Sequence, residues 1–161
     1  HQYGLWVARK CDQYNHAAGI SWLRSAADNG HVDAQYEYAL HLLKANAADP
    51  EQVARNYLRH AAEAGHIPAR HRLGLEILRR SIVEDEVYDG LRWLGMATTD
   101  GHGASALTLA TIHERGLYGV RPDPCTALEW YEVRQSLGLM PSWTFRARIK
   151  LMLSCRRFHP S

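Results

Sequence analysis

Apolar side chains recur every three or four residues along most of the chain, which is the spacing of one face of an α-helix. Tyr38, Leu42 and Leu43 fall on one face in this way. The chain lacks the strict alternation of apolar and polar residues that is typical of a half-buried strand. The pattern therefore predicts an all-α chain, with helices over residues 1–11, 16–29, 33–45, 51–64, 68–80, 87–99, 103–115, 124–137 and 142–155.

An aromatic residue recurs once in each predicted pair of helices. The residues are Trp22, Tyr57, Trp93 and Trp130, at successive separations of 35, 36 and 37 residues. One helix pair of this length cannot hide its apolar face, whereas stacked pairs bury a continuous core. The sequence therefore predicts an α/α solenoid, or superhelix, of about four antiparallel helix pairs.

Glycines and small residues recur with the same period. A glycine follows each aromatic residue by eight positions, where a left-handed turn would end the first helix of the pair; the four are Gly30, Gly65, Gly101 and Gly138. Each second helix carries a small residue, such as Ala39, Gly74 or Ala110, which allows a neighbouring helix to approach closely. Asp123 and Pro124 together predict a capped helix start.

The repeats divide the chain into successive units within one domain, residues 1–161. We expect helix pairs over 16–50, 51–86, 87–123 and 124–155, the last of which caps the array. Residues 1–15 are interpreted as the tail of a preceding repeat.

These units resemble Sel-like repeats, which are relatives of the tetratricopeptide repeat. The resemblance rests on the Ala-Ala-x-x-Gly-His segments at 26–31 and 61–66, and on the Gly-Val-Arg-Pro-Asp run at 119–123 followed by Ala-Leu-Glu-Trp-Tyr at 127–131. It implies a right-handed solenoid of helix pairs that acts as a non-catalytic adaptor or scaffold. The second helix of each pair would line a concave groove that holds a partner protein or peptide.

The resemblance also implies which side chains face that groove. They are Asp33, Tyr36, Leu40, Lys44, His71, Leu75, Arg79, Leu107, Thr111, Glu114 and Arg115. Lys44, Arg79 and Arg115 provide one cation per repeat, which suits an acidic peptide, and the leucines provide apolar anchors. The alternative is that these cations offset helix dipoles and that the leucines pack against the next helix.

Composition and charge narrow the function further. A hydrophobic fraction of 46% with 22% charged residues is typical of a folded chain, and a net charge of +2 over 161 residues gives no reason to expect a nucleic-acid partner. The longest uncharged stretch, residues 101–113, is shorter than the roughly 20 apolar residues of a membrane-spanning helix. We therefore expect no transmembrane segment.

The histidines offer little chemistry. His31, His66 and His102 occupy one repeat position, so we interpret them as structural residues whose imidazoles cap the carbonyls of the preceding helix. The sequence contains neither H-E-x-x-H nor a pair of histidines four residues apart. We expect no metal site and no cofactor.

The cysteines leave an alternative function open. Cys11, Cys125 and Cys155 are odd in number and widely spaced, which predicts unpaired thiols and favours a reducing, cytoplasmic environment over the periplasm. The paired cysteines of some Sel-like proteins have no evident counterpart here. A helix dipole would activate the Cys125 thiol, so the alternatives are a thiol or histidine hydrolase, a small-molecule binder, or a passive spacer in a larger bacterial protein.

The C-terminal segment is basic. Its cations are Arg146, Arg148, Lys150, Arg156 and Arg157. We interpret the segment as a capping helix with a basic outer face; the alternative is a surface for lipid or nucleic acid.

Overall fold

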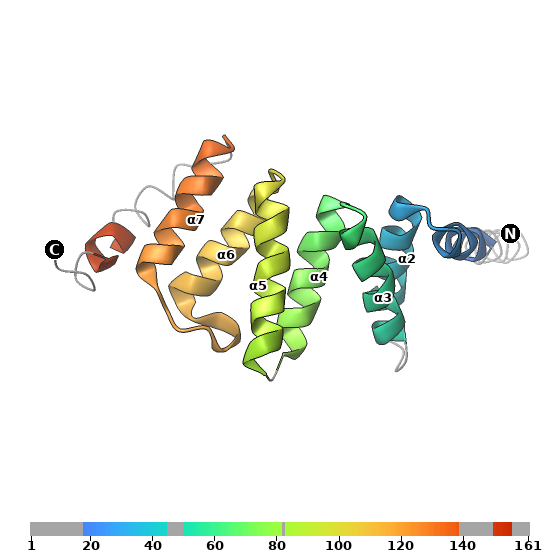
Figure 1. Cartoon of the computed structure of the whole chain (residues 1–161), viewed down its shortest axis with the longest axis horizontal. Helices are drawn as coiled ribbons and strands as arrows, with labels where there is room; N and C mark the ends of the chain where they lie inside the picture. The colour runs from blue at the N-terminus through green and yellow to red at the C-terminus, as the bar shows by residue number, and fades with distance from the viewer. Residues whose placement is uncertain (1–17, 45–49, 82, 139–149, 156–161) are drawn as a thin grey trace, which may run out of the picture. The chain divides into compact units, whose positions relative to one another are not determined.

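The structure, a computed structural model, describes residues 18–44, 50–81, 83–138 and 150–155, and these ranges contain helices and no strand (Figure 1). The first helix covers residues 18–28 and the last covers 150–155. Between them lie α2 (Val32–Lys44), α3 (Pro50–Glu63), α4 (Ile67–Arg80), α5 (Glu84–Thr99), α6 (Gly103–Arg115), the short 3₁₀ turn η1 (Leu117–Gly119) and α7 (Pro124–Ser136). The predicted all-α fold of helix pairs is confirmed.

Most predicted helix boundaries agree with the structure to within one or two residues. The largest difference among the described helices is at α5, which begins at Glu84 instead of residue 87. Glu84, Asp85 and Glu86 form the first turn of this helix, where negative charge stabilises the helix dipole. The helix predicted over residues 1–11, and most of the one predicted over 142–155, lie outside the described residues.

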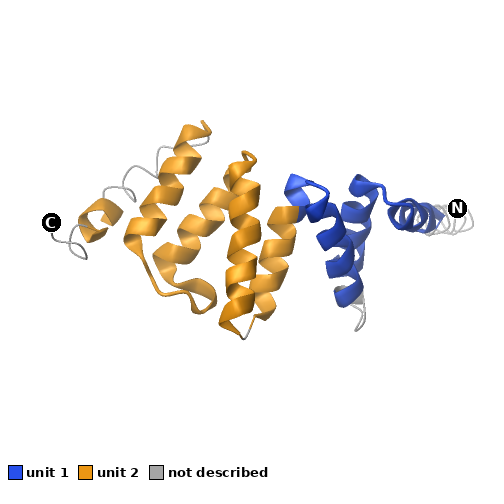
Figure 2. Cartoon of the chain, viewed as in Figure 1, with its two compact units in different colours: residues 1–69 blue, residues 70–161 orange. Residues whose placement is uncertain are grey.

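The chain forms two compact units, residues 1–69 and residues 70–161 (Figure 2). Unit 1 contains the 18–28 helix, α2 and α3, and its core holds the fully buried Ala39, Ala54 and Leu58. Unit 2 contains most of α4 together with α5, α6, α7 and the 150–155 helix. Its first core cluster joins Leu78, Leu94, Leu109 and Ile112. Each unit therefore has buried residues from several successive helices.

The predicted glycine turns are present. Gly30, Gly65 and Gly101 have φ angles of 87°, 93° and 91°, a region that favours glycine because it has no Cβ atom. The residue after each glycine is a histidine, and its backbone N–H donates to the carbonyl five residues earlier; His66 donates to Ala61 at 3.0 Å. This bond ends the first helix of each pair and turns the chain into the second.

The predicted close helix approach is found where α4 packs on α5 within unit 2. A Cβ atom added at Gly74 would lie 2.9 Å from both the Gly90 carbonyl oxygen and Leu94 Cγ. A Cβ atom at Gly90 would lie 2.7 Å from Leu78 Cγ. The two helices therefore meet glycine to glycine, at a separation that excludes larger side chains.

The predicted cap of α7 is also confirmed. Asp123 Oδ1 accepts the backbone N–H groups of Cys125 at 2.9 Å and Thr126 at 3.3 Å, and Pro124 occupies the first turn. The Thr126 hydroxyl donates to Asp123 Oδ2 at 2.7 Å. These hydrogen bonds, that of the Thr126 side chain foremost, lower the pKa of Asp123.

The prediction of unpaired cysteines is wrong. Cys125 and Cys155, which are 30 residues apart in sequence, form a disulfide, with their Cα atoms 5.0 Å apart. The bond joins the first turn of α7 to the 150–155 helix, a contact that cysteine spacing alone does not reveal. The argument for a reducing compartment thereby loses its basis, because disulfides persist mainly in oxidising environments. A disulfide-bonded Cys125 also has no free thiol to act as a nucleophile.

None of the helices in the described ranges combines the length and the apolar character needed to cross a membrane.

Candidate functional site

The repeat histidines connect neighbouring helix pairs within each unit. In unit 1, the rings of Tyr36 and His66 lie 4.7 Å apart between centroids. In unit 2, the corresponding rings of His71 and His102 lie 4.8 Å apart. Two predicted groove residues, Tyr36 and His71, therefore each contact the histidine of the following repeat.

The capping role predicted for the imidazoles is wrong for His66. Its own backbone N–H already binds the Ala61 carbonyl, so the ring faces the next helix instead. His66 Nδ1 accepts the backbone N–H of Ala69 at 3.2 Å, which caps the start of α4. His66 Nε2 lies 3.5 Å from Asp33 Oδ1, so a third predicted groove residue also faces this ring.

His71, His102 and Ser105 form a polar cluster inside unit 2. The Ser105 hydroxyl lies 2.9 Å from His71 Nδ1 and 2.7 Å from His102 Nδ1, and the serine is 0% exposed. One hydroxyl proton serves only one of these nitrogens, so the other nitrogen must carry a proton and donate to the oxygen. The two histidines therefore hold opposite tautomers when both are neutral.

Burial is the main reason that both histidines stay neutral. It lowers the pKa of His71 to about 4, with smaller contributions from the nearby His102 and Arg72. Burial also lowers the pKa of His102. A serine between two neutral histidines has the groups of a nucleophile and a base, but substrate cannot reach a fully buried hydroxyl.

This cluster predicts a loss of stability in acid. Between pH 6.5 and about 4, the unfolded chain takes up a proton at His71 before the folded chain does, so unfolding becomes easier as the pH falls. Allowing for partial exposure of the ring, we expect His71 to contribute a loss of about 1–2 kcal/mol over this range. Urea unfolding at a series of pH values measures the change.

The matched variants are His71→Gln, which removes the titrating group, and His31→Gln, at an exposed repeat histidine. The first should flatten the dependence of unfolding free energy on pH, and the second should leave it unchanged. A His71→Gln chain with the wild-type slope would contradict the assignment.

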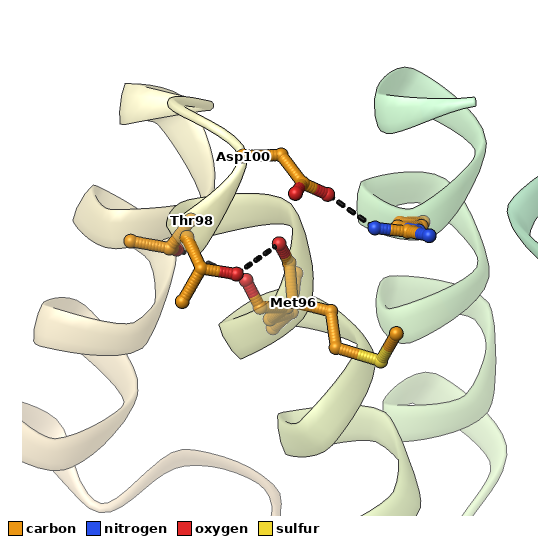
Figure 3. Close-up of polar contacts among 6 residues, drawn as sticks. Met96, Thr98 and Asp100 are labelled. Carbon is orange, nitrogen blue, oxygen red and sulfur yellow. Dashed lines mark hydrogen bonds and ion pairs between the residues drawn. The ribbon is translucent and has the colours of Figure 1, made fainter. Parts of the chain in front are cut away.

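An ion pair lies on the same two helices. Asp100, at the end of α5, extends its carboxylate toward α4, where it pairs with Arg70 (Figure 3). Nearby, the Thr98 hydroxyl donates to the Leu94 carbonyl at 3.0 Å. These bonds hold α4 and α5 together within unit 2.

The three predicted groove cations differ in their surroundings. Lys44, in unit 1, is exposed at the end of α2. Arg79, in unit 2, has Nη1 3.3 Å from Glu76 Oε1, and the same oxygen lies 3.1 Å from Arg72 Nη2. Arg115 is exposed at the end of α6. Arg79 therefore already has an internal counterion, whereas Lys44 extends into solvent.

Several other predicted groove residues in unit 2 pack against neighbouring helices. Leu75 packs on the Leu78 and Leu94 cluster, and Leu107 packs on a second cluster that contains Tyr131. The Thr111 hydroxyl donates to the Leu107 carbonyl at 2.8 Å.

Glu114, another predicted groove residue, binds α7. Its Oε2 accepts the Tyr131 hydroxyl at 2.8 Å. Burial, together with this hydrogen bond, raises the pKa of Tyr131 to about 12.

In unit 1, the predicted residues Leu40 and Lys44 line a hollow of about 360 Å³ between the 18–28 helix and α2. The other described lining residues are Gly19, Ile20, Leu23, Glu37 and His41. The hollow combines aliphatic side chains with charged groups.

The predicted basic tail is described only in part. Lys150 is exposed, and its four arginines lie outside the described residues. Within the described ranges, no three His, Cys, Asp or Glu side chains gather in an arrangement that could hold a metal ion.

Sequence reasoning missed two features of these sites. The Ser105 cluster had a signal, because Ser105 replaces the alanine found at Ala34 and Ala69, and His71 is in the repeat position of Tyr36. The Cys125–Cys155 pairing had only the presence of two cysteines about one repeat apart.

Comparison with known proteins places this arrangement among solved structures. Neither a protein-family model nor a curated protein sequence matches the chain. Two crystal structures are similar: a Sel1 repeat protein from Oxalobacter formigenes, and a protective antigen of uropathogenic Escherichia coli strains that displays an SLR fold. Each aligns with 74% of this chain at 24% identity and a TM-score of 0.61. The aligned part spans 48% of the first protein and 26% of the second.

Proposed function

Because this chain has the Sel1-like repeat fold, we propose that it is a non-catalytic scaffold that binds a segment of a partner protein. The observation that carries the proposal is the hollow in unit 1 lined by Leu40 and Lys44. Both residues belong to the helix surface that the repeat pattern assigns to partner binding. A volume of about 360 Å³ lies within the range of small binding pockets.

The lining of this hollow indicates the chemistry of the segment. Ile20, Leu23 and Leu40 provide an aliphatic wall that suits an apolar side chain. Lys44 is exposed at the rim, where its ammonium group can pair with a carboxylate of the partner. We therefore propose a peptide in which an apolar anchor residue is followed closely by an acidic one.

Binding of fluorescently labelled peptides, each with one leucine flanked by aspartate or glutamate, tests this proposal. We expect Lys44→Glu to weaken binding by about tenfold, a change of about 1.4 kcal/mol. The matched control is Arg59→Glu, the same charge reversal at an exposed position of α3 in the same unit. Circular dichroism confirms that both variants keep their helices.

The result separates the scaffold from its alternatives. Equal binding by the wild type and both variants would contradict a site at Lys44, and absence of binding by every peptide would favour the passive spacer. The disulfide at Cys125 and the burial of Ser105 support the non-catalytic proposal over a thiol or serine hydrolase.

A further inference from the structure

A second hollow in unit 1 has a different chemistry. It has a volume of about 330 Å³ and lies where the end of the 18–28 helix and the start of α2 face α3. The described residues that line it are Ala27, Asp28, Gln35, Val53, Asn56, Tyr57 and His60. These residues include one carboxylate and no lysine or arginine.

Existing hydrogen bonds leave this lining rich in acceptors. The Tyr57 hydroxyl donates to Asp28 Oδ1, so the phenol oxygen can only accept a further hydrogen bond. Gln35, which is buried, donates from Nε2 to the Ala27 carbonyl at 3.3 Å, which fixes its amide and leaves Oε1 as an acceptor. Two lining residues have therefore already used donors within unit 1.

The carboxylate of Asp28 remains accessible. Its Oδ2 is 3.7 Å from Arg24 Nε, and the two side chains are 51% and 65% exposed. A surface ion pair of this kind, four residues apart on one helix, contributes at most about 0.5 kcal/mol. A ligand with better geometry can displace Arg24, whose position shows that a guanidinium group reaches this carboxylate.

We propose that this hollow binds the guanidinium group of an arginine side chain from a partner protein. A guanidinium is planar, carries five N–H donors and accepts none, which matches a wall of acceptors around one carboxylate. The aliphatic part of the arginine would cover Val53, which is 44% exposed. This site does not depend on the proposed peptide site at Leu40 and Lys44, and it takes a ligand of opposite charge.

Titration of Nα-acetylarginine amide into the whole chain tests the proposal, with the side-chain amide NMR signals of Gln35 and Asn56 as the readout. We expect saturable shifts with a dissociation constant in the millimolar range, about 1 mM, as for a single charged anchor. The citrulline amide has the same shape without the charge and should bind at least about tenfold more weakly. The lysine amide should bind with intermediate strength, because its ammonium has three donors.

Two variants should change the affinity in opposite directions. Asp28→Asn should weaken arginine binding at least about tenfold, while Arg24→Gln should strengthen it about twofold by removing the internal competitor. Glu63→Gln, which removes an exposed carboxylate from α3, is the matched control and should have no effect. Equal binding of citrulline, unchanged binding by Asp28→Asn, or no saturable shift up to about 10 mM arginine amide would each overturn the proposal.

Discussion

Replacing both Cys125 and Cys155 with serine is expected to lower the free energy of unfolding of unit 2 by about 3 kcal/mol. The disulfide spans 30 residues, and the closure entropy of such a loop amounts to about 3–4 kcal/mol. The segment released is the connection between α7 and the 150–155 helix, so its amide protons should lose protection first. Hydrogen exchange and denaturant unfolding measure the two effects.

Reduction provides the control for this prediction. A thiol reductant should destabilise the wild type to the level of the double variant and leave the double variant itself unchanged. Alkylation followed by mass determination should add two fewer groups to the oxidised chain than to the reduced chain. If oxidised and reduced chains take up equal numbers of alkyl groups, the pairing of Cys125 with Cys155 is contradicted.

Substitution of Gly74 by valine is expected to destabilise unit 2 by about 3 kcal/mol. The new Cβ would lie 2.9 Å from the Gly90 carbonyl oxygen, and a backbone atom at this crossing cannot move aside as a flexible side chain does. Relief requires α4 and α5 to separate, which would also loosen the packing of Leu94. Thermal unfolding should show a midpoint lowered by several degrees.

Gly95 offers the matched control on α5. A Cβ atom added there meets nothing within 4 Å, so Gly95→Ala should increase stability by about 0.5–1 kcal/mol through the lower backbone entropy of the unfolded chain. Opposite signs at the two glycines would confirm that contact, and not helix propensity, decides the outcome. Destabilisation of similar size at both positions would contradict the glycine contact between α4 and α5.

The sequence allowed the helices and turns to be predicted because their causes are local. The helix spacing of apolar residues, the left-handed turns at Gly65 and Gly101, and the Asp123 cap each depend on a few neighbouring residues. The disulfide was missed because it depends on where a helix packs in three dimensions. The imidazole of His66 was placed at the wrong helix end, because backbone N–H groups had already satisfied the carbonyls.

The candidate site was predictable as a set of helix positions but less so as a surface. Position in the repeat does not distinguish a side chain facing solvent from one covered by the next helix. Leu107 and Glu114 are held by α7, which brings Tyr131 against this helix, whereas Leu40 and Lys44 line a hollow. The residue type on the adjacent helix decides between these outcomes, and that pairing becomes visible only in the structure.

The hydrogen bonds that join successive repeats also bear on how the chain folds. Tyr57 binds Asp28 from 29 residues away, and His71 binds Ser105 from 34 residues away, so both contacts close short loops. Chains dominated by contacts at short sequence separation fold on timescales of about microseconds to milliseconds. Each helix pair can therefore find its native neighbour as soon as the next pair has been synthesised, before the rest of the chain is available.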